Sequence, residues 1–115
     1  MAVWPLAVRA RQRMPVIGFV AGATLKTAGR YLASVRNGLA EYGYVEGQNV
    51  RFELREARYQ TDVMPVLYRE LVDQKVSVIL VDSTLKLELA RAATQSIPIV
   101  FNASSWNRVG DFGPV

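Results

Sequence analysis

The sequence predicts an α/β fold of three layers, an α/β/α arrangement in which helices cover both faces of a mostly parallel sheet. Short apolar segments typical of strands alternate with segments whose apolar residues recur at helical spacing, in the order β-α-β-α-β-α-β. This alternation indicates parallel pairing, because a crossover between parallel strands needs a helix-length connection. The differing patterns of the strands favour the order 2-1-3-4 across the sheet.

Four segments have the pattern of strands. Three of them are nearly unbroken apolar runs, as the buried strands of parallel sheets are: 16–21, 76–81 and 97–101. The remaining segment is 50–55. Its apolar residues, Val50, Phe52 and Leu54, alternate with charged ones, which predicts one buried and one solvent-exposed face. We therefore expect 50–55 at an edge of the sheet, and strands one, three and four buried on both faces.

Three segments between these strands have helical periodicity. In 28–42 the apolar residues fall on one helical face, and Gly43 follows where a C-terminal capping glycine is expected. A second helix is expected to begin near Thr61 or Asp62, since either side chain is a suitable N-cap. A third is expected over 85–94. Each helix connects two strands, as the predicted fold requires.

The composition excludes several classes of function. The 115 residues include neither cysteine nor histidine, which removes disulfides, thiol nucleophiles, Cys-based metal sites and histidine bases. The net charge is +4, but Arg9, Arg11 and Arg13 contribute three of these units and the rest of the chain is nearly neutral. A nucleic-acid-binding domain is expected to have a basic face in its folded part. We therefore expect one domain with no cofactor and no nucleic-acid partner.

Three loops follow strands one, three and four at the carboxyl ends of the predicted strands. Open parallel sheets bind ligands at this edge, beside the switch point, which here lies between strands one and three. The candidate ligand-binding residues are those of the three loops: Gly22, Ala23, Thr24, Asp82, Ser83, Thr84, Asn102 and Ala103. The first two loops open helices whose N–H groups can hold a carboxylate, and Asp82 can pair with an ammonium group. The expected ligand is an amino acid or a similar small polar metabolite.

These residue types also have structural interpretations. Ser83 and Thr84 are common N-cap residues, Asp82 can be a structural carboxylate, and Gly22 can simply end a strand. Outside the loops, Tyr59 is a candidate for stacking on a ligand.

Two further groups of residues, tyrosines and glutamates, are expected to have structural rather than functional roles. Tyr42 and Tyr44, on either side of Gly43, are expected to pack against the end of the first helix. Glu53 and Glu56 are expected to be surface charges rather than an acid/base pair.

No catalytic motif is present in the chain. The sequence lacks a G-x-G-x-x-G fingerprint, a P-loop and a G-x-S-x-G elbow, so we predict no enzymatic activity. Two alternatives stay open. One is a flavodoxin-like or nucleotide-binding enzyme fragment, which would need a better phosphate loop than 22–27. The other is a degenerate remnant that binds no ligand.

The two ends of the chain differ in pattern from the segment between them. Residues 1–13 combine a short apolar stretch with Val8-Arg9-Ala10, which resembles a small-x-small cleavage site. We interpret 1–13 as the remnant of an export signal or a disordered start, 14–104 as an α/β ligand-binding lobe, and 105–115 as an irregular tail. The protein is expected in the periplasm if it is exported, and in the cytoplasm if the remnant is not a functional signal.

Several segments resemble the ABC transporter substrate-binding protein family that includes the tryptophan/tyrosine-type binding proteins. Residues 14–19 are similar to the first strand of that family, and 97–101 to a later one. The most specific match is the helix exit and turn from Gly43 to Val50 (Gly-Tyr-Val-Glu-Gly-Gln-Asn-Val). The likeness covers roughly residues 2–101, whereas the three loops at the strand ends depart from the family pattern.

This resemblance implies a flavodoxin-like lobe of the type I periplasmic-binding fold, in which two similar lobes clamp a ligand. It implies an ABC permease as partner and places this chain as a truncated first lobe, with the N-terminal segment as the end of an export signal. A fourth strand at the border of such a lobe would present an apolar edge, so we also expect a homodimer through that edge.

Overall fold

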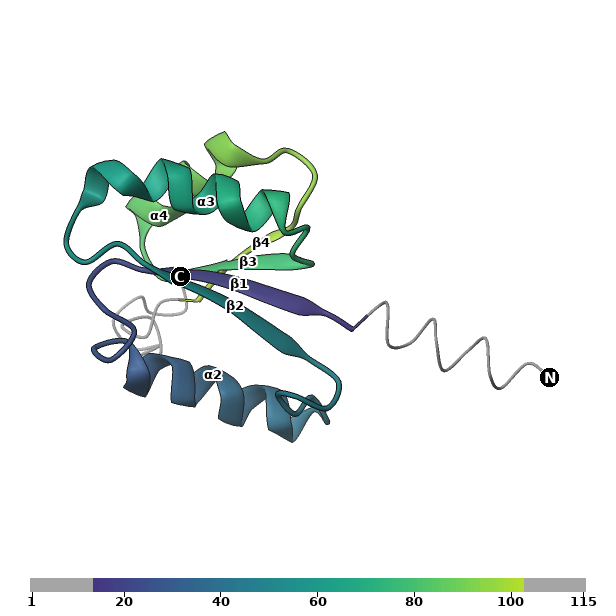
Figure 1. The fold of residues 1–115 in the computed structure, drawn as a ribbon. Coiled ribbons are helices and arrows are strands. Elements are labelled where there is room, and N and C mark those ends of the chain that lie inside the picture. Colours follow the sequence, from purple (N-terminus) through teal and green to yellow (C-terminus); the bar gives the residue numbers. More distant parts are fainter. Residues whose placement is uncertain (1–13, 103–115) are drawn as a thin grey trace, which may run out of the picture.

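The computed structural model describes residues 14–102, and the interpretations of 1–13 and of 103–115 concern residues outside this range. The chain forms four strands and three helices in the predicted alternation (Figure 1). Their bounds are β1 Val16–Ala21, α2 Gly29–Glu41, β2 Arg51–Glu56, α3 Met64–Asp73, β3 Val78–Val81, α4 Thr84–Ala93 and β4 Ile99–Phe101.

The four strands pair in parallel in the order β2-β1-β3-β4, which confirms the predicted order. Helix α2 lies on one face of the sheet, and α3 and α4 lie on the other (Figure 1). This distribution follows from right-handed crossovers. The connection from β1 to β2 runs one way across the sheet, whereas those from β2 to β3 and from β3 to β4 run the other way. The three predicted layers are therefore present.

The central strand β1 is buried along its whole length. On one side Val20 packs with Tyr68, Leu71 and Ile79 beneath α3 and α4. On the other side Ile17 and Phe19 belong to a second cluster that includes Leu32 of α2 and Leu80 of β3. Side chains that alternate along one strand thus supply two separate cores.

Strand β4 differs from the prediction that it is buried on both faces. Ile99 and Phe101 pack partly against the core beneath α3 and α4, but Val100 on the opposite face is 48% exposed. The reason is its place at the end of the sheet, next to β3 only. An apolar run therefore correctly predicted a strand but not its surroundings.

The connection from α2 to β2 explains the most specific part of the sequence resemblance. Gly43 has φ +89°, and the N–H groups of Gly43 and Tyr44 donate to the carbonyls of Ala40 and Leu39 at 3.0 and 2.9 Å. This is a Schellman ending, which needs the left-handed conformation that glycine adopts freely. Asn49 then holds the turn, because its side-chain oxygen accepts from Val45 N–H at 2.7 Å. The turn from Gly43 to Val50 therefore directs the chain into β2.

Two local predictions are wrong. Tyr42 and Tyr44 do not pack against the end of α2 but are 82% and 44% exposed, since Tyr42 is the C-cap residue and borders the open groove between α2 and the sheet. Neither Thr61 nor Asp62 caps α3, because both belong to a 3-10 turn, Thr61–Val63, that precedes the helix. Val63 takes the capping position without a side-chain hydrogen bond.

Candidate functional site

The switch point between β1 and β3 contains a crevice of about 220 Å³ at the carboxyl ends of these strands. Four of the predicted residues line it: Gly22, Ala23, Thr24 and Asp82. Six residues that were not candidate site residues also line it: Phe19, Ala21, Thr27, Ala28, Tyr31 and Lys86. Small-molecule sites usually enclose roughly 300–1,000 Å³, so this crevice matches a small ligand or one side of a larger site.

A partly buried ion pair lies in the crevice. Lys86, in the first turn of α4, has a side chain only 9% exposed, and its Nζ lies 2.7 Å from Oδ1 of Asp82. The same Nζ is 4.9 Å from the centroid of the Phe19 ring. Phe19 packs in the cluster that faces α2, whereas α4 covers the opposite face (Figure 1). The Lys86 side chain thus crosses the carboxyl end of the sheet, where both an anion and a ring stabilise its charge.

Two aromatic rings form one wall. Phe19 and Tyr31 stack with ring centroids 5.3 Å apart, and the Tyr31 hydroxyl donates to the backbone carbonyl of Asn102. Burial first, and the negative charge of Asp82 second, raise the pKa of Tyr31 well above its usual range. The hydroxyl therefore stays protonated and remains a donor. This bond ties α2 to the end of β4.

The loop between β1 and α2 is held by its own side chains. The Thr24 hydroxyl accepts from Thr27 N–H at 3.1 Å, and the Thr27 hydroxyl donates to the Thr24 carbonyl at 2.8 Å. Leu25 N–H donates to Oε1 of Glu56 at 2.8 Å. These internal bonds already occupy N–H groups that the sequence had suggested for holding an anion. Phosphate capture by this loop, which the nucleotide-binding alternative requires, is correspondingly disfavoured.

Glu53 and Glu56 have separate structural roles, as expected of charges outside a catalytic pair. They are three positions apart on β2, so their side chains point to opposite faces of the strand. Glu56 holds Leu25, as described, whereas Glu53 accepts from Arg55 at 3.0 Å and from Arg51 at 3.1 Å. The charged face of β2 was predicted to be exposed to solvent. It is only half-exposed, because Arg55 also binds Glu70 of α3 at 2.8 Å.

A strained turn borders the crevice. Arg58 and Tyr59 follow β2 with φ +53° and +69°, although neither is glycine. Their N–H groups donate to the carbonyls of Ala23 and Gly22 at 2.7 and 2.8 Å. Two consecutive left-handed residues cost on the order of 1 kcal/mol each and persist only where the surroundings hold them. This turn fixes the loop that lines the crevice and leaves the Tyr59 side chain 77% exposed.

The other predicted site residues lie elsewhere. Ser83 is the N-cap of α4, with its hydroxyl accepting from Lys86 N–H at 3.2 Å, and Thr84 begins that helix. Asn102 lines a different cavity, between α2 and the sheet, and touches the crevice wall only through its carbonyl. Ala103 lies outside the described residues. Gly22, Ala23, Thr24 and Asp82 are therefore the predicted residues that the structure brings together.

Lys86 is the main residue that sequence reasoning missed. A weak signal was present, since a lysine in the first turn of a helix opposes the helix dipole and follows Asp82 by four positions. Within residues 14–102 there is no group of three or more acidic side chains that could hold a metal ion. None of the three described helices is long and apolar enough to cross a membrane.

Comparisons with known proteins agree with this geometry. The family model described as ABC transporter substrate binding protein matches residues 14–112, most of the chain. A solved structure described as a conserved domain protein from Vibrio cholerae O1 biovar eltor str. N16961 superposes with a TM-score of 0.69 at 23% sequence identity. The match covers 76% of this chain and 30% of that one, and supports the fold alone. No curated protein matches the sequence.

Proposed function

The chain belongs to the ABC transporter substrate binding protein family, and from this premise we propose that its crevice binds a small polar ligand such as an amino acid. Membership of the family supports a solute-binding role. The finer assignment of ligand chemistry rests on the residues of the crevice itself.

The partly buried pair of Lys86 and Asp82 carries the proposal. An amino acid has a carboxylate and an ammonium group on one carbon, which complement the Lys86 ammonium and the Asp82 carboxylate. Both side chains line the crevice while also contacting each other. A ligand that binds both charges would keep each of them paired, whereas a ligand with one charge would leave the other side chain without compensation.

The surroundings of the pair suit a ligand with a small apolar part. The stacked rings of Phe19 and Tyr31 form an apolar wall. The loop of Thr24 and Thr27 is held in place by internal hydrogen bonds, so little ordering is needed on binding. Tyr59 N–H is bonded to the Gly22 carbonyl of the crevice loop and its side chain is exposed, so we propose that this side chain contacts whatever covers the crevice.

We further propose the wider setting that the family implies. The chain spans about 30% of the length of the solved structure that it matches. In the proposed arrangement this chain supplies one side of a ligand site, a second lobe closes over it, and an ABC permease receives the ligand. The periplasm is the proposed location, and binding without catalysis is the proposed activity.

The test is a titration of the chain with alanine, followed by NMR through the amide signals of residues 22–24 and 82–86. One lobe buries little of the ligand, so we expect a Kd on the order of 1 mM. Propionate and ethylamine, which each present one of the two charges, are expected to bind at least tenfold more weakly.

Matched variants assign the effect to the ion pair. Lys86→Met is expected to weaken alanine binding about tenfold, equivalent to roughly 1.4 kcal/mol. Lys26→Met removes the same charge from an exposed position of the neighbouring loop and is expected to leave binding unchanged. Equal binding by the parent and by Lys86→Met, or a complete lack of shifts with alanine at tens of millimolar, would rule out the proposal.

A further inference from the structure

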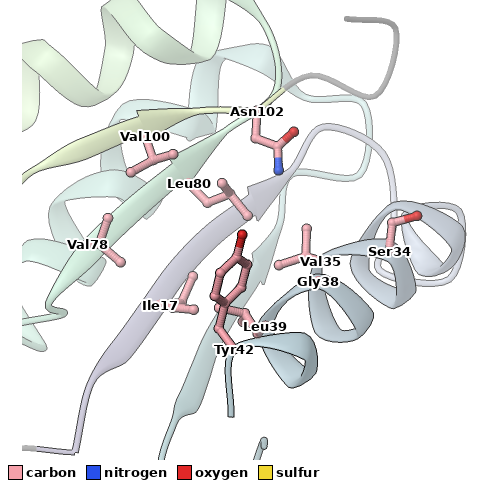
Figure 2. A pocket seen from close by; sticks show the side chains of 10 residues that line it. All are labelled: Ile17, Ser34, Val35, Gly38, Leu39, Tyr42, Val78, Leu80, Val100 and Asn102. Atoms are coloured by element: carbon pink, nitrogen blue, oxygen red, sulfur yellow. The ribbon is translucent and has the colours of Figure 1, made fainter. Parts of the chain in front are cut away.

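A second cavity, separate from the crevice, lies between α2 and the sheet. It is a groove of about 360 Å³. Figure 2 shows Val35 and Leu39 of α2 facing Ile17, Leu80 and Val100 of the strands across it. These lining side chains are apolar, unlike the ion pair in the crevice.

The groove exists because helix cover on this face is incomplete. Both crossovers that run toward β4 place their helices, α3 and α4, on the opposite face. Helix α2 packs over β1 and β2, where Arg36 lies 5.1 Å from the Phe52 ring. Among residues 14–102 no helix covers β3 and β4 on the α2 side, and Val100 is 48% exposed there. An apolar surface of this kind usually contacts another segment.

We propose that residues 103–115 of the same chain dock into this groove, with Trp106 as the main apolar anchor. The segment continues directly from Asn102, which itself lines the groove. Its start is therefore already at the binding surface, and docking needs only a short loop closure. Thirteen residues can extend to about 43 Å, so the reach of the segment is not limiting.

The composition of the segment matches an apolar groove. Its four large apolar residues recur at every third position: Trp106, Val109, Phe112 and Val115. Arg108 and Asp111 are its charged side chains, and they are of opposite sign. A period of three places the apolar side chains on one face of a backbone with three residues per turn, such as polyproline II. Such a backbone can present all four to one surface.

Gly38 provides a second reason to expect an occupant. It lies inside the C-terminal half of α2 and lines the groove, and a Cβ placed on it would meet no atom within 4 Å. A glycine inside a helix costs roughly 0.5–1 kcal/mol relative to alanine. Nothing in the packing of α2 among the described residues requires that cost. A bulky side chain that inserts at this position explains the space.

Disulfide trapping in the whole chain tests the proposal without background, because the chain has no cysteine. Ser34 lines the groove, so the double variant Ser34→Cys/Val109→Cys is expected to form an intramolecular disulfide on mild oxidation. Arg91→Cys/Val109→Cys, whose first cysteine lies on α4 across the sheet, is the matched control and is expected to stay reduced. A covalent dimer would instead indicate a second copy in the groove, and it would overturn the proposal, as would equal trapping in both variants.

Fluorescence of Trp106 gives an independent measurement. In a Trp4→Phe background, Trp106 is the single tryptophan, and a docked indole is expected to emit at shorter wavelength than one in water. Gly38→Leu fills the groove and is expected to shift the emission toward longer wavelength. Gly29→Leu adds the same side chain to open space at the start of α2 and is expected to have no effect. Emission typical of a fully hydrated indole in the Trp4→Phe parent would contradict the proposal.

Discussion

Two helices, α3 and α4, cover one face of the sheet, whereas α2 alone covers the other (Figure 1). Beneath α3 and α4, Tyr68, Leu71 and Ile79 are completely buried. On the α2 face Leu80 is still 6% exposed, and Val100 is about half-exposed. The first face therefore has the packing of a protein interior, and the second retains apolar surface that other groups can contact.

This difference separates the main source of stability from the surfaces for which we propose binding. The closed face contains the larger of the two buried clusters and is expected to supply most of the free energy of folding. The crevice and the groove are both lined by side chains of the α2 face, such as Phe19 and Leu39. Incomplete cover on that side thus leaves room for a ligand at one end and for a chain segment along the length of the sheet.

Truncating one leucine on each face tests the comparison most strongly. Leu71→Ala removes a completely buried side chain and is expected to lower the free energy of unfolding by about 3 kcal/mol, since a cavity is left behind. Leu39→Ala removes a partly buried one and is expected to cost roughly 1 kcal/mol. Urea unfolding of both variants measures the difference. Equal losses would contradict the claim that the faces are packed differently.

Adding one methyl group to each face is the complementary change. A Cβ on Gly18 would lie 3.0 Å from Cδ1 of Leu71 and 3.3 Å from both methyl groups of Val76, so Gly18→Ala is expected to cost about 1–3 kcal/mol. Gly29→Ala, at the exposed start of α2 and outside the groove, meets open space and is expected to stabilise the protein by about 0.4–1 kcal/mol. Thermal unfolding should give shifts of opposite sign, and destabilisation by both would contradict the difference in packing between the two positions.

Tyr31, which is partly buried, and Tyr68, which is completely buried, give a smaller contrast in how stability depends on pH. Burial first, and Asp82 second, raise the pKa of both Tyr31 and Tyr68. The raised pKa contributes stability that is present below the unfolded value of about 10 and is lost as pH rises toward the folded value. The Tyr68 hydroxyl has no hydrogen-bond partner within residues 14–102, whereas that of Tyr31 donates to Asn102.

Replacing each tyrosine with phenylalanine therefore has a different effect at neutral pH. Tyr31→Phe is expected to cost about 1 kcal/mol through the lost hydrogen bond, whereas Tyr68→Phe is expected to be neutral or slightly stabilising. Both variants should lose less stability than the parent between pH 9 and pH 11, as measured by urea unfolding at each pH. A large loss in Tyr68→Phe at pH 7 would show that its hydroxyl has a partner.

The smallest change in stability is expected from replacing a charged residue of the edge strand β2. Hydrogen bonds from Arg55 chiefly, and from Arg51, lower the pKa of Glu53 below its usual range. The lowered pKa contributes stability that is present above about pH 4.3 and is lost as pH falls through the folded value. Glu53→Gln should therefore weaken the loss of stability below pH 4. Glu46→Gln, also in an exposed ion pair with an arginine, is the control, and an equal change there would contradict a specific role for Glu53.

Much of the fold could be predicted because it depends on local patterns. The apolar run 16–21 and the alternation in 50–55 distinguished the central strand from the edge strand, which was enough to order the sheet. Gly43 marked the end of α2 because few other residues adopt φ +89° at low cost. Family membership over residues 14–112 agrees with these patterns.

The failures share a different physical cause. Whether Tyr42 packs, whether Val100 is covered and whether Lys86 faces solvent all depend on neighbours that are distant in the sequence. An N-cap residue such as Thr61 can equally start a 3-10 turn, and the choice depends on how the preceding strand ends. Local propensity contains none of this information.

By itself, then, the sequence determined the strands, the helices, their order in the sheet and the edge at which the crevice lies, because periodicity and handed crossovers are properties of the chain. Only the tertiary structure decided which side chains line that crevice. Lys86 reaches Asp82 and Phe19 because β1 and β3 are adjacent and α4 begins just behind them. It also decided that one face of the sheet is closed and the other open, since two crossovers run toward β4 and one runs away from it.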